Sequence, residues 1–365
     1  MNFTIEQNIV LQSCYLTKKN GVSEQFETVK DQVNWDLIVK LAAKNRVLGL
    51  LHNNLLKTEI LNDMPIYYIQ MLEDFGDSTS FRNDIKLEEL SKLRIAAKQI
   101  GIPFAPVKGG YLIDNIYKNR RLRATNDIDA LIKRKDIQRV HDMMSSNGYL
   151  QGEYDKANNA VLKSDRNKKM LYKTKMYNLL PYIKIDHNNP NNIVFFDLSF
   201  ALDFSLNSVP IDEMLDMAIS TEKGIELLPE HFLIHICCHH YREASNVAWI
   251  MLGKDFNLIK FCDVREFILQ KMDSDSITKA IQFAKKHGLE KAIYFTIYFI
   301  REIYNDGYET EILESLGIED EAFLYQFGEK DYGKLQTRKK DFWTSLFSDN
   351  NKDEIVQEPK YKSLI

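Results

Sequence analysis

The chain has 365 residues, of which 44% are hydrophobic and 27% charged, a composition typical of a globular protein. A largely disordered, collagen-like or disulfide-scaffold chain is therefore excluded. Lys and Arg number 48 and Asp and Glu 52, so the net charge of −4 provides no overall basic excess for binding long duplex DNA.

The N-terminal sequence and the apolar segments predict neither a secretory signal nor a membrane span. Residues 1–7 lack a basic stretch followed by an apolar run. Residues 47–51, among the longest apolar stretches, are far too short to cross a bilayer. Four cysteines are too few for a disulfide framework. We therefore expect a cytoplasmic protein with reduced thiols and no membrane partner.

Residues 1–100 are expected to form an N-terminal helical region. Apolar residues at helical spacing predict a helix that begins at residue 34 or 35. A second helix is predicted from residue 65, where proline suits the first turn. Gly76-Asp77-Ser78 is expected to interrupt it, and the helix should resume over residues 81–100.

Residues 101–205 have a different texture, in which short apolar runs alternate with helical segments. We expect strands at 102–107, 127–132, 182–187 and 193–200, helices at 111–117 and 135–146, and a turn at 188–192. The order β-α-β-α-β-β predicts a small mixed sheet. Residues 206–348 return to helical periodicity, and residues 349–365 form a polar tail. The predicted fold class is α+β, with helical regions on both sides of the sheet.

Two acids, Asp127 and Asp129, lie two positions apart on a predicted strand, so both carboxylates project from one face. Adjacent carboxylates repel each other unless a cation neutralises them. Mg²⁺ suits such a pair together with phosphate oxygens. Upstream, Gly109-Gly110 follows a strand and opens a helix, where backbone N–H groups can approach a phosphate. Together these features indicate a nucleoside-triphosphate (NTP) site.

These residues resemble the polymerase-β-type nucleotidyltransferase superfamily. The resemblance rests on the turn Pro106-Val107-Lys108-Gly109-Gly110 and on the segment from Arg123 to Ile132, which contains Asp127-Ile128-Asp129. The group labelled "uncharacterised nucleotidyltransferase" is the more similar one, with a Lys-Gly turn and an Arg four residues before Asp-Ile-Asp. The pattern is also similar to abortive-infection toxin nucleotidyltransferases.

The resemblance implies a third carboxylate on a neighbouring strand. Asp197, a lone acid in an apolar strand, matches best, and Asp186 is the second choice. A capping or hairpin role is the alternative for Asp197. Ser199 stands where the family often has a histidine.

The resemblance further implies two-metal nucleotidyl transfer, with two Mg²⁺ ions, or Mn²⁺ instead. Asp127 and Asp129 would hold both ions, and Asp197 the ion that activates the acceptor. Lys108, the Gly109-Gly110 amides and Arg123 would bind the triphosphate. For Lys108 a plain surface position is the alternative. The acceptor would be a small molecule, a protein side chain or an RNA end such as that of tRNA. A degenerate, non-catalytic nucleotidyltransferase module is the competing hypothesis.

Two histidine patterns offer further candidate metal sites. His231, His235 and His239 lie on one helical face with spacing compatible with zinc, but no second ligand motif accompanies them, and packed core histidines are the favoured interpretation. His141-Asp142 is typical of metal phosphohydrolases, but the other positions that such enzymes need are not evident.

Overall fold

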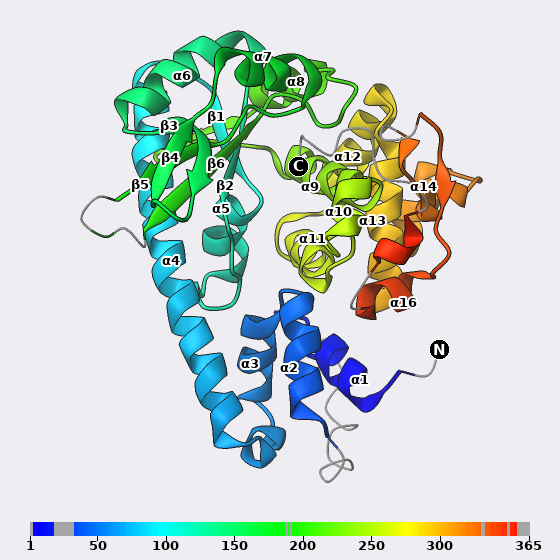
Figure 1. Ribbon diagram of the computed structural model, residues 1–365. Helices are drawn as coiled ribbons and strands as arrows, with labels where there is room; N and C mark the ends of the chain where they lie inside the picture. The colour runs from blue at the N-terminus through cyan, green and yellow to red at the C-terminus, as the bar shows by residue number, and fades with distance from the viewer. Residues whose placement is uncertain are drawn as a thin grey trace. The chain divides into compact units, whose positions relative to one another are not determined.

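The computed structural model describes residues 3–17, 33–186, 189, 192–329, 333–348 and 351–355 (Figure 1). Its contacts divide the chain into two compact units. The sheet unit contains residues 78–120 and 124–236, and the helical unit contains residues 1–77, 121–123 and 237–365. The predicted α+β class is confirmed, with a mixed sheet and helices that precede and follow it in the chain.

The sheet unit is built on six strands in the order β1-β2-β6-β5-β3-β4. Their bounds are β1 Phe104–Val107, β2 Ile128–Ile132, β3 Leu150–Asp155, β4 Ala160–Lys163, β5 Tyr182–Ile185 and β6 Ile193–Ser199. β2 and β6 are parallel, and the other neighbouring strands are antiparallel. β6, the last of these six strands in the chain, lies in the middle of the sheet.

Alternate residues of the strands are apolar and point to the same face of the sheet, and helices cover that face. Ile128, Ala130 and Ile132 of β2 belong to one buried cluster with Leu90 and Val140. The helices of this unit are α5 Gly109–Leu112 with the π-helical turn η3 Ile113–Tyr117, α6 Ile137–Ser146, α7 Arg166–Lys175 and α8 Val209–Asp216, together with part of α4 Ile66–Gln99 and of α9 Pro229–Ala244. The hairpin of β7 Ile219–Thr221 and β8 Gly224–Glu226 completes the unit.

The expected interruption at residues 76–78 is wrong, because α4 is continuous from Ile66 to Gln99. Gly76 has a packing reason instead. A Cβ atom there would lie 2.9 Å from Nε of Arg121, so the glycine leaves room for the arginine side chain against the helix. A single glycine lowers helix propensity by only about 1 kcal/mol and does not end a long helix.

β3, β4 and α7 were not predicted from the sequence. β3 reads Leu-Gln-Gly-Glu-Tyr-Asp, and α7 is rich in lysine and buries none of its residues, so neither shows a clear apolar period. The predicted pairing of the two later strands is confirmed by the antiparallel β5–β6 register. His187 and part of the predicted 188–192 turn lie outside the described residues.

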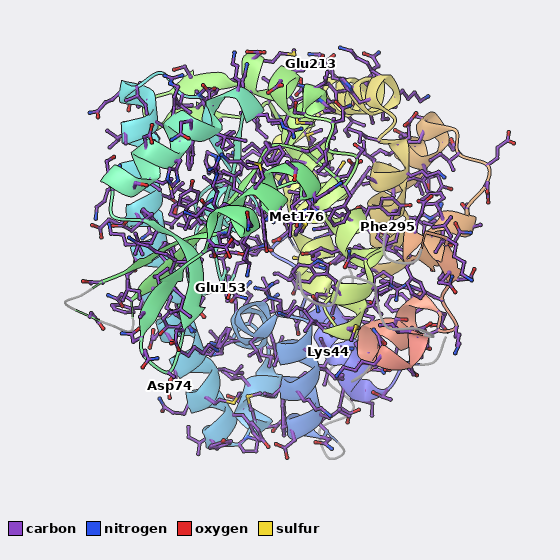
Figure 2. All side chains as sticks on the ribbon, turned by 45° about the horizontal axis from the view of Figure 1, so that its top comes forward. Lys44, Asp74, Glu153, Met176, Glu213 and Phe295 are labelled. Atoms are coloured by element: carbon purple, nitrogen blue, oxygen red, sulfur yellow. The ribbon has the colours of Figure 1, made fainter. Side chains whose placement is uncertain are left out.

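The helical unit packs around aromatic side chains. Phe299 stacks on Phe342 with ring centroids 4.3 Å apart, and Phe295, labelled in Figure 2, stacks on Phe256. Its remaining helices are α1 Ile5–Gln12, α2 Trp35–Lys44, α3 Leu48–Leu55, α10 Val247–Met251, α11 Leu258–Lys271, α12 Ser274–His287, α13 Glu290–Ile303, α14 Tyr308–Leu316 and α16 Phe342–Phe347.

No disulfide joins the cysteines in the structure. Cys14, Cys237, Cys238 and Cys262 are all buried thiols. In the described parts of the chain, no helix combines the length and the apolar character that crossing a membrane requires.

Candidate active site

The sheet brings three carboxylates together. Asp129 of β2 lies opposite Asp197 of β6 in the parallel register, so their side chains share one face of the sheet. Asp127 directly precedes β2, which begins one residue later than predicted. Because Ile128 and Ala130 point into the core, the acids lie on the other face. Asp129 is 4% exposed, whereas Asp127 and Asp197 are half-buried.

The cluster is electrostatically costly without a cation. Burial raises the pKa of Asp129 to about 7, and the charges of Asp127 and Asp197 add to the rise, whereas Lys108 opposes it. Two like charges thus act on one buried carboxylate. A bound cation would relieve this repulsion and so stabilise the charged form of the carboxylates.

Lys108 supplies one positive charge to the cluster. Its Nζ lies 2.6 Å from Oδ1 of Asp129, and 18% of its side chain is exposed. The residue adopts φ 48° and ψ −131°, at the turn where β1 ends and α5 begins. A positive φ is uncommon for a residue with a side chain and costs of order 1–3 kcal/mol. The turn therefore holds a strained lysine directly against the most buried acid.

Asn178 and Tyr172 surround Asp197, and the sequence analysis identified neither. Asn178 donates from Nδ2 to Oδ1 of Asp197 at 2.7 Å. Burial, with the charge of Asp197 as a further cause, raises the pKa of Tyr172. Asp186, the second choice for the third acid, lies beside Asn192 at the start of β6, several residues from Asp197. Asp197 is thus the acid that joins the pair.

Two polar side chains of α4 hydrogen-bond to the backbone of the segment that leads to Asp127. Asn83 donates to the carbonyl oxygen of Arg120 at 2.9 Å, and Nζ of Lys86 donates to that of Thr125 at 2.6 Å. Burial lowers the pKa of Lys86 to about 8, and the charge of Asp127 opposes the shift. These residues continue the buried stripe of Leu90, Leu93 and Ala97 at helical spacing. Polar residues at positions of an otherwise apolar stripe could have identified them from the sequence.

Gly110 allows α5 to lie close to the sheet. A Cβ atom there would be 3.2 Å from Cγ2 of Ile128 and 3.3 Å from Cδ2 of Leu90. Gly109 and Gly110 are both buried and form the first two positions of α5. The N–H groups of the first helical turn have no acceptor within their own helix. The glycine pair therefore has a packing role that is compatible with the predicted phosphate contact.

Arg123 makes a buried ion pair in the helical unit. Its guanidinium donates to both carboxylate oxygens of Asp263 on α11, with Nη2 and Oδ2 2.6 Å apart. Only 12% of the Arg123 side chain and 5% of the Asp263 side chain are exposed. The structure thus assigns Arg123 a structural partner that the sequence analysis did not include.

We expect Arg123→Ala to lower the free energy of unfolding by about 3 kcal/mol, because it leaves the carboxylate of Asp263 buried without its guanidinium. Urea denaturation of Arg123→Ala, Asp263→Ala and the double variant measures the coupling between the two residues. A coupling energy near zero would show that the pair does not stabilise the fold.

The histidine helix is largely buried. His231 and His235 are 2% and 3% exposed, and His239 lies 3.3 Å from the carboxylate of Glu243. Among the residues that the structure describes, no three His, Cys, Asp or Glu side chains are grouped as ready metal ligands. At the acid cluster, Lys108 and Asn178 are instead hydrogen-bonded to the carboxylates.

β1 leads through Lys108 and the Gly109-Gly110 pair into α5, and β2 and β6 of the same mixed sheet carry Asp129 and Asp197. Residues 31–305 match the family model described as "Uncharacterised nucleotidyltransferase". The chain belongs to this family. No curated protein and no solved structure matches it.

Proposed function

We propose that the protein is a metal-dependent nucleotidyltransferase that moves a nucleoside monophosphate from an NTP to an acceptor hydroxyl and releases pyrophosphate. The observation that carries the proposal is the pairing of Asp129 with Asp197 across β2 and β6, with Asp127 beside them. Membership in a nucleotidyltransferase family supports the reaction class.

The donor set fits Mg²⁺. Three carboxylates share one face, and their mutual repulsion is among the causes that raise the pKa of the buried Asp129. Hard oxygen ligands are those that Mg²⁺ prefers, and Mn²⁺ accepts the same set. Bound to Asp127, Asp129 and Asp197, two ions would neutralise the triphosphate and activate the acceptor hydroxyl.

The chain's own groups would orient the substrate. Lys108 would exchange its contact with Asp129 for the triphosphate, and the amides of Gly109 and Gly110 would donate to phosphate oxygens. Arg123, predicted from the resemblance as a phosphate ligand, would have to share its guanidinium with Asp263. Asn178 would hold the carboxylate of Asp197 toward the acceptor side.

The acceptor in this proposal is a small molecule, a protein side chain or an RNA end such as that of tRNA. The competing function is a degenerate module that binds nucleotide or a partner without turnover. Ser199, which is 8% exposed on β6 where related sequences often have a histidine, motivates this alternative.

The test is pyrophosphate release by the full chain from each of the four NTPs, with tRNA, protein extract or metabolite extract as acceptor. We expect release that requires Mg²⁺ or Mn²⁺ and stops when EDTA is added. An α-³²P label then identifies the acceptor class. Nucleotide binding of equal strength with and without divalent metal, and no release with any acceptor, would favour the non-catalytic module.

A further inference from the structure

A cavity in the sheet unit has none of the three acids in its lining. Its volume is about 340 Å³, and residues of α6, α7, β3 and β5 line it. Its lining includes His141, Gln151, Arg166, Lys169, Lys173 and Tyr182. Tyr182 shares a face with Phe196, which belongs to the apolar core, whereas Asp197 next to it points to the opposite face.

The cavity wall formed by α7 is positively charged. Arg166, Lys169 and Lys173 recur at spacings of three and four residues, so they follow one side of the helix. Within the described chain, none of the three makes an ion pair or a side-chain hydrogen bond. Lys168, which does not line the cavity, pairs with Glu153. Among the described residues that line the cavity, none is Asp or Glu.

The floor of the cavity offers neutral hydrogen-bonding groups. Nδ1 of His141 lies 3.0 Å from the hydroxyl of Tyr182, which is 1% exposed. Burial lowers the pKa of His141, and the charges of Lys169 and Lys173 also lower it, whereas the charge of Asp142 opposes the shift. Asp142, the neighbouring acid, accepts a hydrogen bond from Gln138 at 2.9 Å and does not line the cavity.

We propose that this cavity, the α6–α7 pocket, binds the phosphate group of a small phosphorylated molecule at a site separate from the acid cluster. A phosphate carries up to two negative charges and several acceptor oxygens, which match three cations beside a histidine and a tyrosine hydroxyl. The volume suits a ligand of nucleotide size or smaller, since ligand cavities begin near 300 Å³. This site does not depend on the proposed reaction.

The pocket accounts for the His141-Asp142 pair without hydrolytic chemistry. His141 faces lysines, and its Nδ1 is engaged with Tyr182 rather than with a second acid. It can therefore donate from or accept at its other ring nitrogen, toward a bound oxygen. Two lysines and an arginine that repel one another in the free protein are stabilised when an anion enters.

The test is calorimetric titration of the full chain with pyrophosphate, in low salt at pH 7 with EDTA, so that no divalent ion can recruit phosphate to the acids. We expect Lys169→Gln/Lys173→Gln to weaken binding at least about tenfold, because it removes two charge-assisted contacts. The matched control, Lys168→Gln/Lys175→Gln, removes the same charge from the same helix outside the pocket and should change binding less than about twofold.

Equal weakening in both double variants, or no binding of pyrophosphate by the wild-type chain, would overturn the proposal. Arg166→Gln, at an exposed position, is a single-site check that leaves the fold unchanged and should weaken binding severalfold. Titration with a nucleoside monophosphate and with a ten-nucleotide 5′-phosphorylated RNA separates the ligand sources. Tighter binding of the RNA, with the same dependence on Lys169 and Lys173, would contradict the small-molecule assignment.

Discussion

Asp129→Asn is expected to lower the rate of pyrophosphate release at least about a hundredfold, because Asp129 is the carboxylate that both other acids and Lys108 face. Asparagine keeps the shape of the side chain but removes the charge that would hold a divalent ion. The measurement is release of pyrophosphate at saturating NTP and Mg²⁺, with the acceptor found by label transfer.

Asp275→Asn is the matched control for this substitution. Asp275 pairs with Lys279 on the exposed surface of α12, where ion pairs contribute little, so activity should stay within about twofold. The melting temperature of Asp129→Asn without metal should equal or exceed that of the wild type at pH 8, since a buried charge has been removed. Full activity in Asp129→Asn would exclude Asp129 as a metal ligand.

The stability of the metal-free protein is expected to fall as the pH rises from about 4 to about 7. The raised pKa of Asp129, about 7, means that the folded chain binds a proton that the unfolded chain has already released. Stability from this group is therefore complete below the unfolded pKa and is lost as the pH passes through the folded one. The loss is at most about 1.4 kcal/mol for each pH unit in this range.

Urea denaturation of the wild type and of Asp129→Asn, across this pH range in EDTA, isolates the contribution of Asp129. As the pH rises, the free energy of unfolding of Asp129→Asn should increase relative to that of the wild type. Mg²⁺ binds the deprotonated carboxylates, so it should raise the melting temperature of the wild type more at pH 8 than at pH 6. Parallel curves for the two proteins would mean that Asp129 titrates normally.

Local patterns in the sequence were sufficient to predict the elements that carry the acids. Alternation around Asp129 and the apolar run around Asp197 predicted two strands, and the structure pairs them. The choice of Asp197 over Asp186 depended on a family resemblance, and the register places Asp197 beside Asp129. The roles of these acids in metal binding and catalysis stay predictions.

Contacts made across long sequence distances could not be predicted in the same way. Asn178 lies in an irregular segment, and nothing in its neighbourhood indicates that it will meet Asp197. Arg123 was predicted to bind phosphate from the resemblance alone, and its pairing with Asp263 depends on tertiary structure. Lys86 had a readable signal, a charge within the stripe of the helix predicted over residues 81–100, but its contact with the carbonyl oxygen of Thr125 depends on tertiary structure.

The central position of β6 has a consequence for synthesis of the protein on the ribosome. β1 to β5 emerge first, yet β2 and β5 become connected only when β6 inserts between them. A nascent chain that ends before Ile193, where β6 begins, already contains the glycine turn and the first two acids, but it exposes two unjoined strand edges. Closing a contact this distant in sequence is slow, so the nascent chain is most prone to aggregation just before β6 emerges.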